Sequence, residues 1–72
     1  MEIINITTEF IKLQDLMKLA NMVETGGEAK ILIQNCQVTV DGEPCLQRGK
    51  KIRPGNIVSF NNQNYSVAYA DQ

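Results

Sequence analysis

The spacing of apolar residues changes from a helical to an alternating pattern near the middle of this 72-residue chain, and this change limits the folds available to it. Before the change, apolar residues recur at helical spacing and form one stripe: Leu13, Leu16, Met17, Ala20 and Val23. After it, Val38 and Val40 alternate with polar residues, as in a half-buried strand. We therefore expect an α+β fold in which helices pack on a small sheet.

Two short helices are expected over residues 13–22 and 26–35. Thr25 and Glu28 match the capping box, in which a hydroxyl and a glutamate satisfy the amides exposed at a helix start. The Gly26-Gly27 pair before this glutamate allows a tight turn between the helices. Two helices joined in this way form a helix-turn-helix unit.

One narrow face of the second helix is apolar and includes a cysteine. Its members are Ala29, Leu32, Ile33 and Cys36, so Cys36 is expected to be a core thiol. The other cysteine is Cys45, and both thiols are expected to be free because disulfides are unusual in a reducing compartment. Without a CxxC pair or any histidine, we expect no metal site and no cofactor.

The remaining strands follow from alternation and turn residues. Residues 2–6 alternate weakly, and Asp41-Gly42 supplies a two-residue hairpin turn after residues 38–40. Residues 57–60 and 65–69 complete a mostly antiparallel sheet. For most of the aromatic residues on these strands, core packing is expected rather than stacking on bases: Phe60, Tyr65 and Tyr69.

Several functional classes are disfavoured by composition. The chain has no histidine, no Gly-x-Ser-x-Gly and no phosphate-binding P-loop pattern, so we do not expect an enzyme. No apolar run approaches the roughly 20 residues that span a bilayer. The N-terminal segment carries no positive charge, so we do not expect a signal peptide. We expect a cytoplasmic location. We expect one domain over residues 1–72.

The charge distribution is uneven although the formal net charge is only −1. No acid lies between Pro44 and Ala70, whereas the segment "RGKKIR" carries four of the seven bases. This segment is either a solvated turn or an anion-binding patch, which Lys18 and Lys30 could extend. The segment "TGGEAK" is likewise either a capped helix start or a phosphate site.

The order of these pieces is more specific than any one of them. The segment "LQDLMKLANMVETGGEAKILIQNCQVTVDGEPCLQRGKKIRPGNIVSF" resembles the S4-like RNA-binding domain, or alpha-L motif, over roughly residues 12–60. It looks most similar to the small stand-alone YaaA-like or YbcJ-like members. The resemblance implies a helix-turn-helix on a sheet and binding to structured RNA, ribosomal or transfer. We expect an RNA-binding module without catalysis, and ribosomal proteins are further candidate partners.

The resemblance also implies which residues contact RNA. The positions that correspond to the family's RNA contacts are Lys12, Thr25, Gly26, Lys30, Arg48, Lys50, Lys51 and Arg53. From face geometry we add Lys18 and Gln34. The chain departs from the family at Gly26, where an arginine is frequent, at Cys36, where a glycine is common, and at Asn56, where an aspartate is usual.

A second hypothesis is a protein-interaction adaptor or a ubiquitin-like carrier. Carrier chemistry needs a C-terminal Gly-Gly, and this chain ends Ala70-Asp71-Gln72, so we do not expect that chemistry. The RNA hypothesis depends on a spatial prediction: cations distant in sequence must converge on one face.

Overall fold

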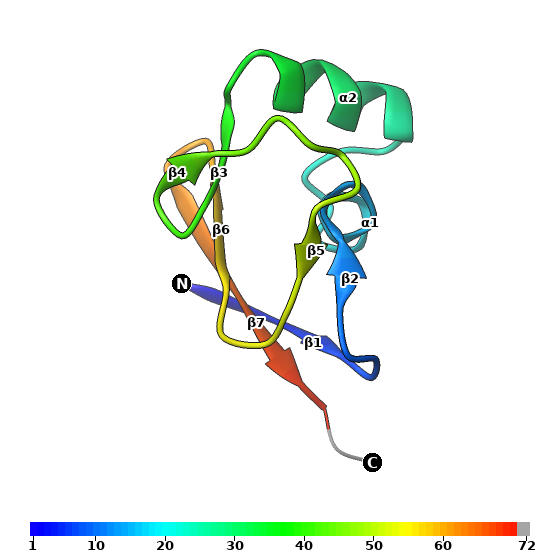
Figure 1. Cartoon of the computed structure of the whole chain (residues 1–72), viewed down its shortest axis with the longest axis vertical. Helices are drawn as coiled ribbons and strands as arrows, with labels where there is room; N and C mark the ends of the chain where they lie inside the picture. The colour runs from blue at the N-terminus through cyan, green and yellow to red at the C-terminus, as the bar shows by residue number, and fades with distance from the viewer. Residues whose placement is uncertain (71–72) are drawn as a thin grey trace.

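Two helices lie against one end of a twisted sheet in the computed structural model, which describes residues 1–70 (Figure 1). The helices are α1 (Leu13–Leu19) and α2 (Gly26–Gln34). The five-stranded sheet has the order β1-β7-β6-β3-β4, where the strands are β1 (Glu2–Ile6), β3 (Val38–Val40), β4 (Glu43–Pro44), β6 (Ile57–Phe60) and β7 (Gln63–Tyr69). The predicted α+β architecture is confirmed.

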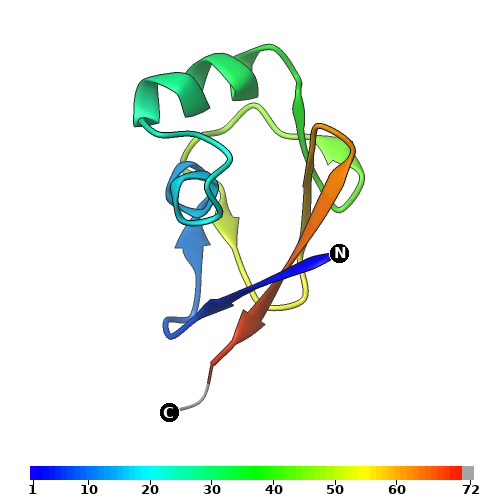
Figure 2. The same cartoon turned by 180° about the vertical axis from the view of Figure 1, so that it is seen from behind.

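Strand pairing in this sheet is antiparallel except at one edge. There β1 runs parallel to β7, as the view from behind shows (Figure 2). Ile4 lies opposite Val67 in this pair. A separate ribbon pairs β2 (Ile11–Lys12) with β5 (Lys51–Ile52) in antiparallel register. This ribbon was not predicted, because two-residue strands leave no alternation to detect.

Both hairpin turns of the sheet use left-handed backbone. Asp41 and Gly42 have φ values of 53° and 88°, as the predicted two-residue turn between β3 and β4 requires. Asn61 and Asn62 do the same between β6 and β7, with φ values of 54° and 64°. The last strand therefore begins at Gln63, two residues earlier than its predicted start at residue 65.

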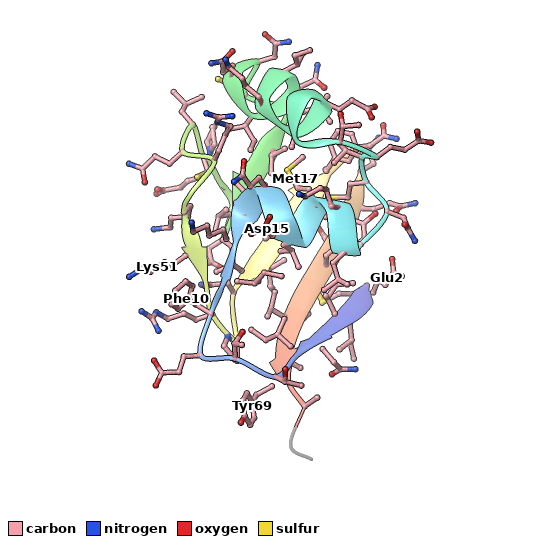
Figure 3. The ribbon with its side chains drawn as sticks, turned by 90° about the vertical axis from the view of Figure 1, so that its right-hand side faces the viewer. Glu2, Phe10, Asp15, Met17, Lys51 and Tyr69 are labelled. Carbon is pink, nitrogen blue, oxygen red and sulfur yellow. The ribbon has the colours of Figure 1, made fainter. Side chains whose placement is uncertain are left out.

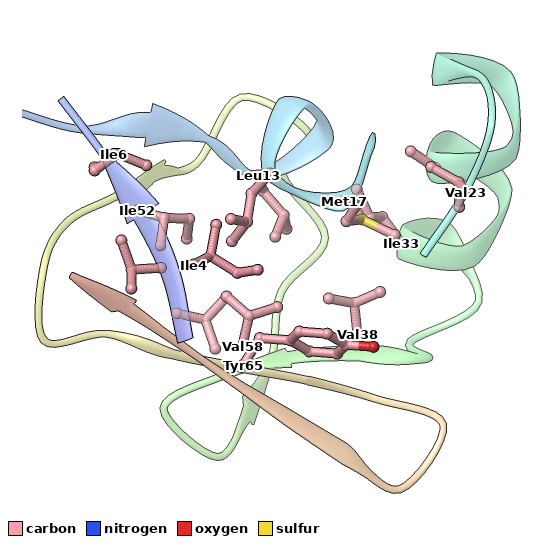
Figure 4. Close-up of a cluster of buried hydrophobic side chains, with 14 residues drawn as sticks. Ile4, Ile6, Leu13, Met17, Val23, Ile33, Val38, Ile52, Val58 and Tyr65 are labelled. Atoms are coloured by element: carbon pink, nitrogen blue, oxygen red, sulfur yellow. The ribbon is translucent and has the colours of Figure 1, made fainter. Parts of the chain in front are cut away.

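The core lies between the helices and the sheet (Figure 4). Leu13, Leu16 and Met17 of α1 are completely buried, which confirms the centre of the predicted apolar stripe. They pack in one cluster with residues of α2 and the strands: Ala29, Ile33, Val38, Ile52, Val58, Tyr65 and Val67. Each fully buried large side chain contributes about 1.5–3 kcal/mol, so this cluster holds the two helices on the sheet.

Helix α1 ends at Leu19, earlier than the predicted residue 22. Asn21 has a φ of 60°, its amide donates to the Lys18 carbonyl at 3.1 Å, and the Met22 amide donates to the Met17 carbonyl at 2.9 Å. This pair of bonds is a Schellman motif, which closes the helix and redirects the chain.

Helix α2 ends in the same way, and this overturns the prediction for Cys36. The Cys36 amide donates to the Ile33 carbonyl, and the Gln37 amide donates to the Leu32 carbonyl, both at 3.1 Å. Cys36 itself has a φ of 58° and is exposed, so the prediction of a core thiol was wrong. The helical period stops one residue before it, and it no longer shares a face with Ile33. A cysteine occupies the conformation that glycine usually provides there.

The aromatic side chains divide between core and surface. Tyr65 is buried and Phe60 is half-buried, in line with core packing for most of the three aromatic residues, whereas Tyr69 is 56% exposed. Tyr69 is the last residue of β7, beyond the region that the helices cover (Figure 3). Both cysteines are free thiols, as predicted. Asp71 and Gln72, on which the expectation about carrier chemistry partly rests, lie outside the described residues.

Candidate nucleic-acid interface

The β2–β5 ribbon places two lysines directly opposite each other. In its register, Lys12 pairs with Lys51 and Ile11 pairs with Ile52. Ile52 is completely buried, so the neighbouring Lys51 points to the exposed side, because successive side chains of a strand alternate. Arg53 is two residues after Lys51, so its side chain points to the same exposed side. Like charges placed opposite each other are unfavourable without a counter-charge.

An aromatic ring organises this side of the ribbon. The Lys51 Nζ atom lies 4.9 Å from the centroid of the Phe10 ring, and the Arg53 Cζ atom lies 5.6 Å from it. These are cation–π distances, and Figure 3 shows Phe10 beside Lys51. We call Lys12, Lys51 and Arg53, with Phe10, the cationic ribbon. No sequence pattern indicates a role for Phe10, since a lone aromatic residue between short strands has no period.

The loop that carries the other two basic residues is anchored on α1. The Leu13 amide donates to the Lys50 carbonyl at 2.9 Å, and the Gln14 amide donates to the Arg48 carbonyl at 3.1 Å. The first amides of α1 are therefore bonded to the loop backbone. These two bonds fix Arg48 and Lys50 close to the point where the ribbon meets the helix, while both side chains remain exposed.

A groove of about 800 Å³ lies between the cationic ribbon and the β3–β4 hairpin. Its basic lining residues are Lys50, Lys51 and Arg53. The other lining residues include carboxylate, apolar and amide side chains: Val40, Asp41, Glu43, Pro44, Cys45, Leu46, Gln47 and Asn56. Three of the four bases of the predicted segment thus line a hollow of mixed character, and Arg48 does not line it.

A hydrogen-bond chain joins the two walls of this groove. The Asn56 Nδ2 atom donates to Asp41 Oδ2 at 2.7 Å, and the Ile57 amide donates to Asp41 Oδ1 at 2.8 Å. The Arg53 amide donates to Asn56 Oδ1 at 2.7 Å. Sequence reasoning explained Asp41 only as a turn residue and missed this role, which depends on a partner 15 residues away.

The "TGGEAK" turn is a helix cap. Thr25 Oγ1 accepts from the Glu28 amide at 3.2 Å, and Glu28 Oε1 accepts from the Glu24 amide at 3.1 Å. The hydroxyl half of the predicted capping box is confirmed, while the glutamate reaches one residue further back than expected. A Cβ built at Gly26 would meet no atom within 4 Å, so the space beside this glycine is open.

The other predicted contact residues lie apart from the groove. Lys18 lies 3.5 Å from the Asp15 carboxylate in the one ion pair found within residues 1–70. Lys30 and Gln34 are exposed on α2 and do not line the groove. The structure therefore brings Lys12, Lys51 and Arg53 together on the cationic ribbon, and of these Lys51 and Arg53 line the groove together with Lys50. That α2 belongs to the same face stays a prediction.

Within residues 1–70, no group of three or more Cys, Asp or Glu side chains is arranged to hold a metal ion. None of the helices in that range is long and apolar enough to cross a membrane.

The arrangement of a helix-turn-helix, a β3–β4 hairpin and a basic loop matches a known family. A model of the S4 domain matches residues 4–68. This chain belongs to the S4 domain family. The predicted resemblance is therefore confirmed.

Three comparisons place the chain within this family. It is 40% identical over 57 residues to "Probable ribosome maturation protein RlbA" of Bacillus subtilis, an alignment that covers 79% of this chain and 80% of the relative. It is equally identical to YbcJ of Escherichia coli, over 79% of this chain and 81% of YbcJ. The solution structure of YbcJ superposes with a TM-score of 0.72 at 35% identity, covering 94% of this chain and 87% of that one. That structure is described as revealing an alpha-L motif involved in RNA binding.

Proposed function

We propose that this S4-domain protein binds RNA without catalysis, through the cationic ribbon and the adjoining basic loop. The observation that carries the proposal is the cation array itself. Lys12 and Lys51 lie opposite each other, Arg53 shares the Phe10 ring with Lys51, and none of the three forms an ion pair within residues 1–70. Such an array suits a polyanion, because each lysine or arginine that neutralises a phosphate releases condensed counterions.

The relatives support RNA as the partner, and we propose that this RNA is structured. RlbA is named for ribosome maturation, and the alpha-L motif of YbcJ is described as involved in RNA binding. We extend both properties to this chain, with ribosomal RNA as the first candidate, transfer RNA as the second, and the cytoplasm as the place of action. Proteins that bind folded RNA read its shape and its phosphates rather than a deep groove of base edges.

A second contact region belongs to this proposal. Thr25, Gly26, Lys30 and Gln34 lie at the start and along the exposed side of α2. The open space beside Gly26 would let an RNA backbone approach closely. We propose that this region adds to the affinity, while Lys18 contributes less because it is already paired with Asp15.

The experiment is a titration of a ribosomal RNA fragment and a transfer RNA at low salt. The wild-type protein is compared with a variant in which Arg48, Lys50, Lys51 and Arg53 are changed to glutamate. We expect binding by the wild type and loss of most affinity in the variant, with circular dichroism used to confirm that the variant is folded. Equal binding by the two proteins, or no binding by the wild type, would contradict the proposal.

A protein adaptor is the second candidate, and exposed apolar side chains favour it. Among residues 1–70, six large apolar side chains are 55–75% exposed: Met1, Ile3, Leu19, Ile31, Leu46 and Tyr69. A ribosomal protein is the partner that this reading suggests. Co-purification that survives nuclease treatment would favour the adaptor, and loss of the partner after nuclease would favour RNA.

A further inference from the structure

The groove beside the cationic ribbon presents both signs of charge. Lys50, Lys51 and Arg53 lie on one wall, and Asp41 and Glu43 lie on the other. A run of phosphates alone would be repelled by the carboxylates. The composition of the groove therefore suits a ligand that is anionic at one end and carries hydrogen-bond donors at the other.

The two carboxylates differ in what they can still accept. Both oxygens of Asp41 accept bonds, one from the Asn56 side chain and one from the Ile57 amide. Glu43 is exposed, and within residues 1–70 its carboxylate takes part in no hydrogen bond or ion pair. Glu43 is therefore the carboxylate of the groove lining with both oxygens free to accept from a ligand.

The groove also has an apolar part. Leu46 is 60% exposed and lies next to Pro44 and Cys45 in the lining. Only Cys45 of these three packs against the core, so Leu46 offers apolar surface that the fold itself does not use. The volume of the groove, about 800 Å³, lies within the usual range for small-ligand sites.

We propose that this groove takes one unpaired nucleotide of the bound RNA and prefers guanine. The phosphate would meet Lys50, Lys51 and Arg53, the base would pack on Leu46 and Pro44, and its Watson–Crick edge would donate to Glu43. Guanine presents two adjacent donors, N1–H and N2–H, that match the two carboxylate oxygens, whereas uracil presents one donor between two acceptors. This inference rests on the proposed RNA-binding function.

The test uses short RNA hairpins with a uridine loop in which one position is G, C, A, U or inosine. The full-length wild-type protein is expected to bind the G loop about tenfold more tightly than the U loop, as for one well-formed base contact. Inosine lacks the N2 amino group, so it should recover only part of the preference. In Glu43→Gln the preference should fall to within about twofold, because the amide presents one donor and one acceptor.

A matched control and a separate readout keep the two proposals distinguishable. Glu2→Gln makes the same charge change on β1, outside this groove, and should keep the preference for G. If wild type binds all the loops equally, or if Glu43→Gln retains the preference, the nucleotide site is wrong while RNA binding stands. If wild type binds no hairpin at low salt, both proposals fail. If free GMP binds as tightly as the G loop, the site takes a free nucleotide and the assignment to RNA is overturned.

Discussion

The Asn56 side-chain amide donates a 2.7 Å hydrogen bond to the carboxylate of Asp41, and this bond ties two turns of the fold together. Asp41 begins the β3–β4 hairpin turn, and Asn56 follows the Pro54-Gly55 turn that leads into β6. Because Asn56 also accepts from the Arg53 amide, the bond links the hairpin wall of the groove to the cationic ribbon.

The first prediction concerns the charge of this pair. In Asn56→Asp, the donor to Asp41 is lost and two carboxylates are brought together. We expect the free energy of unfolding to fall by about 1–3 kcal/mol, the usual cost of an interaction broken in this way. Urea denaturation measures the change.

The exchange variant Asp41→Asn with Asn56→Asp is the control, because it restores one amide and one carboxylate with every acceptor retained. It should recover most of the lost stability. If the single variant is as stable as wild type, or the exchange recovers nothing, the hydrogen bond does not join the turns.

The second prediction concerns Cys36, which holds a φ of 58° at the end of α2. Cys36→Gly should raise the stability by up to about 1 kcal/mol, because glycine adopts this conformation without the steric cost of a Cβ atom. Thermal or urea unfolding measures it. Cys36→Ala removes the thiol and keeps the Cβ atom, so it should leave the stability nearly unchanged. A glycine variant less stable than the alanine variant would contradict this reading of the helix end.

The third prediction concerns the ring under the cations. Phe10→Leu removes the cation–π contacts to Lys51 and Arg53 but changes no charge. RNA affinity should fall several-fold, since exposed contacts of this type are worth about 0.5–1 kcal/mol each. The dependence of affinity on salt should be unchanged, because the number of neutralised phosphates is the same. An altered salt dependence would mean that the ring does more than order the two cations.

The fourth prediction concerns the α2 turn. Gly26→Arg introduces a side chain into space where nothing lies within 4 Å of its Cβ atom, and Gly26 has no positive φ that would resist the change. If this turn contacts the same RNA as the ribbon, affinity should rise by several-fold through an added phosphate contact. Gly26→Gln is the uncharged control. An arginine variant with unchanged affinity and unchanged salt dependence would show that the turn faces away from the RNA.

The fold could be predicted from the sequence wherever residues follow a period. The stripe that includes Leu13, Leu16 and Met17 predicted the first helix. The alternation of Val38 and Val40 predicted the strand that leads into the hairpin. Helix ends were predicted less well. Asn21 and Cys36 adopt left-handed backbone conformations with backbone hydrogen bonds at the helix ends, and the pattern of side chains does not indicate such bonds.

The candidate site was predicted only in part, for the same reason. The basic segment was visible as composition, but the opposition of Lys12 and Lys51 requires the register of two strands that are two residues long. Phe10 and Asn56 act through partners distant in the chain, and a single sequence does not show such pairs. The contribution of Lys30 stays a prediction.

The most direct measurement of the central claim is the slope of log affinity against log salt for RNA binding. The slope is measured for the wild type and for the double variant Lys12→Gln with Lys51→Gln. The control is the double variant Gln63→Glu with Asn64→Asp, which has the same net charge as the first double variant. The control residues line a separate hollow near the N-terminus, and both replacements keep their acceptor oxygens. This slope is negative, and we predict that its magnitude decreases by about 0.7–0.9 for each lysine removed. In the control, the slope should stay at the wild-type value. Equal slopes for all three proteins, or the same fall in both variants, would contradict the claim that the cationic ribbon holds the RNA.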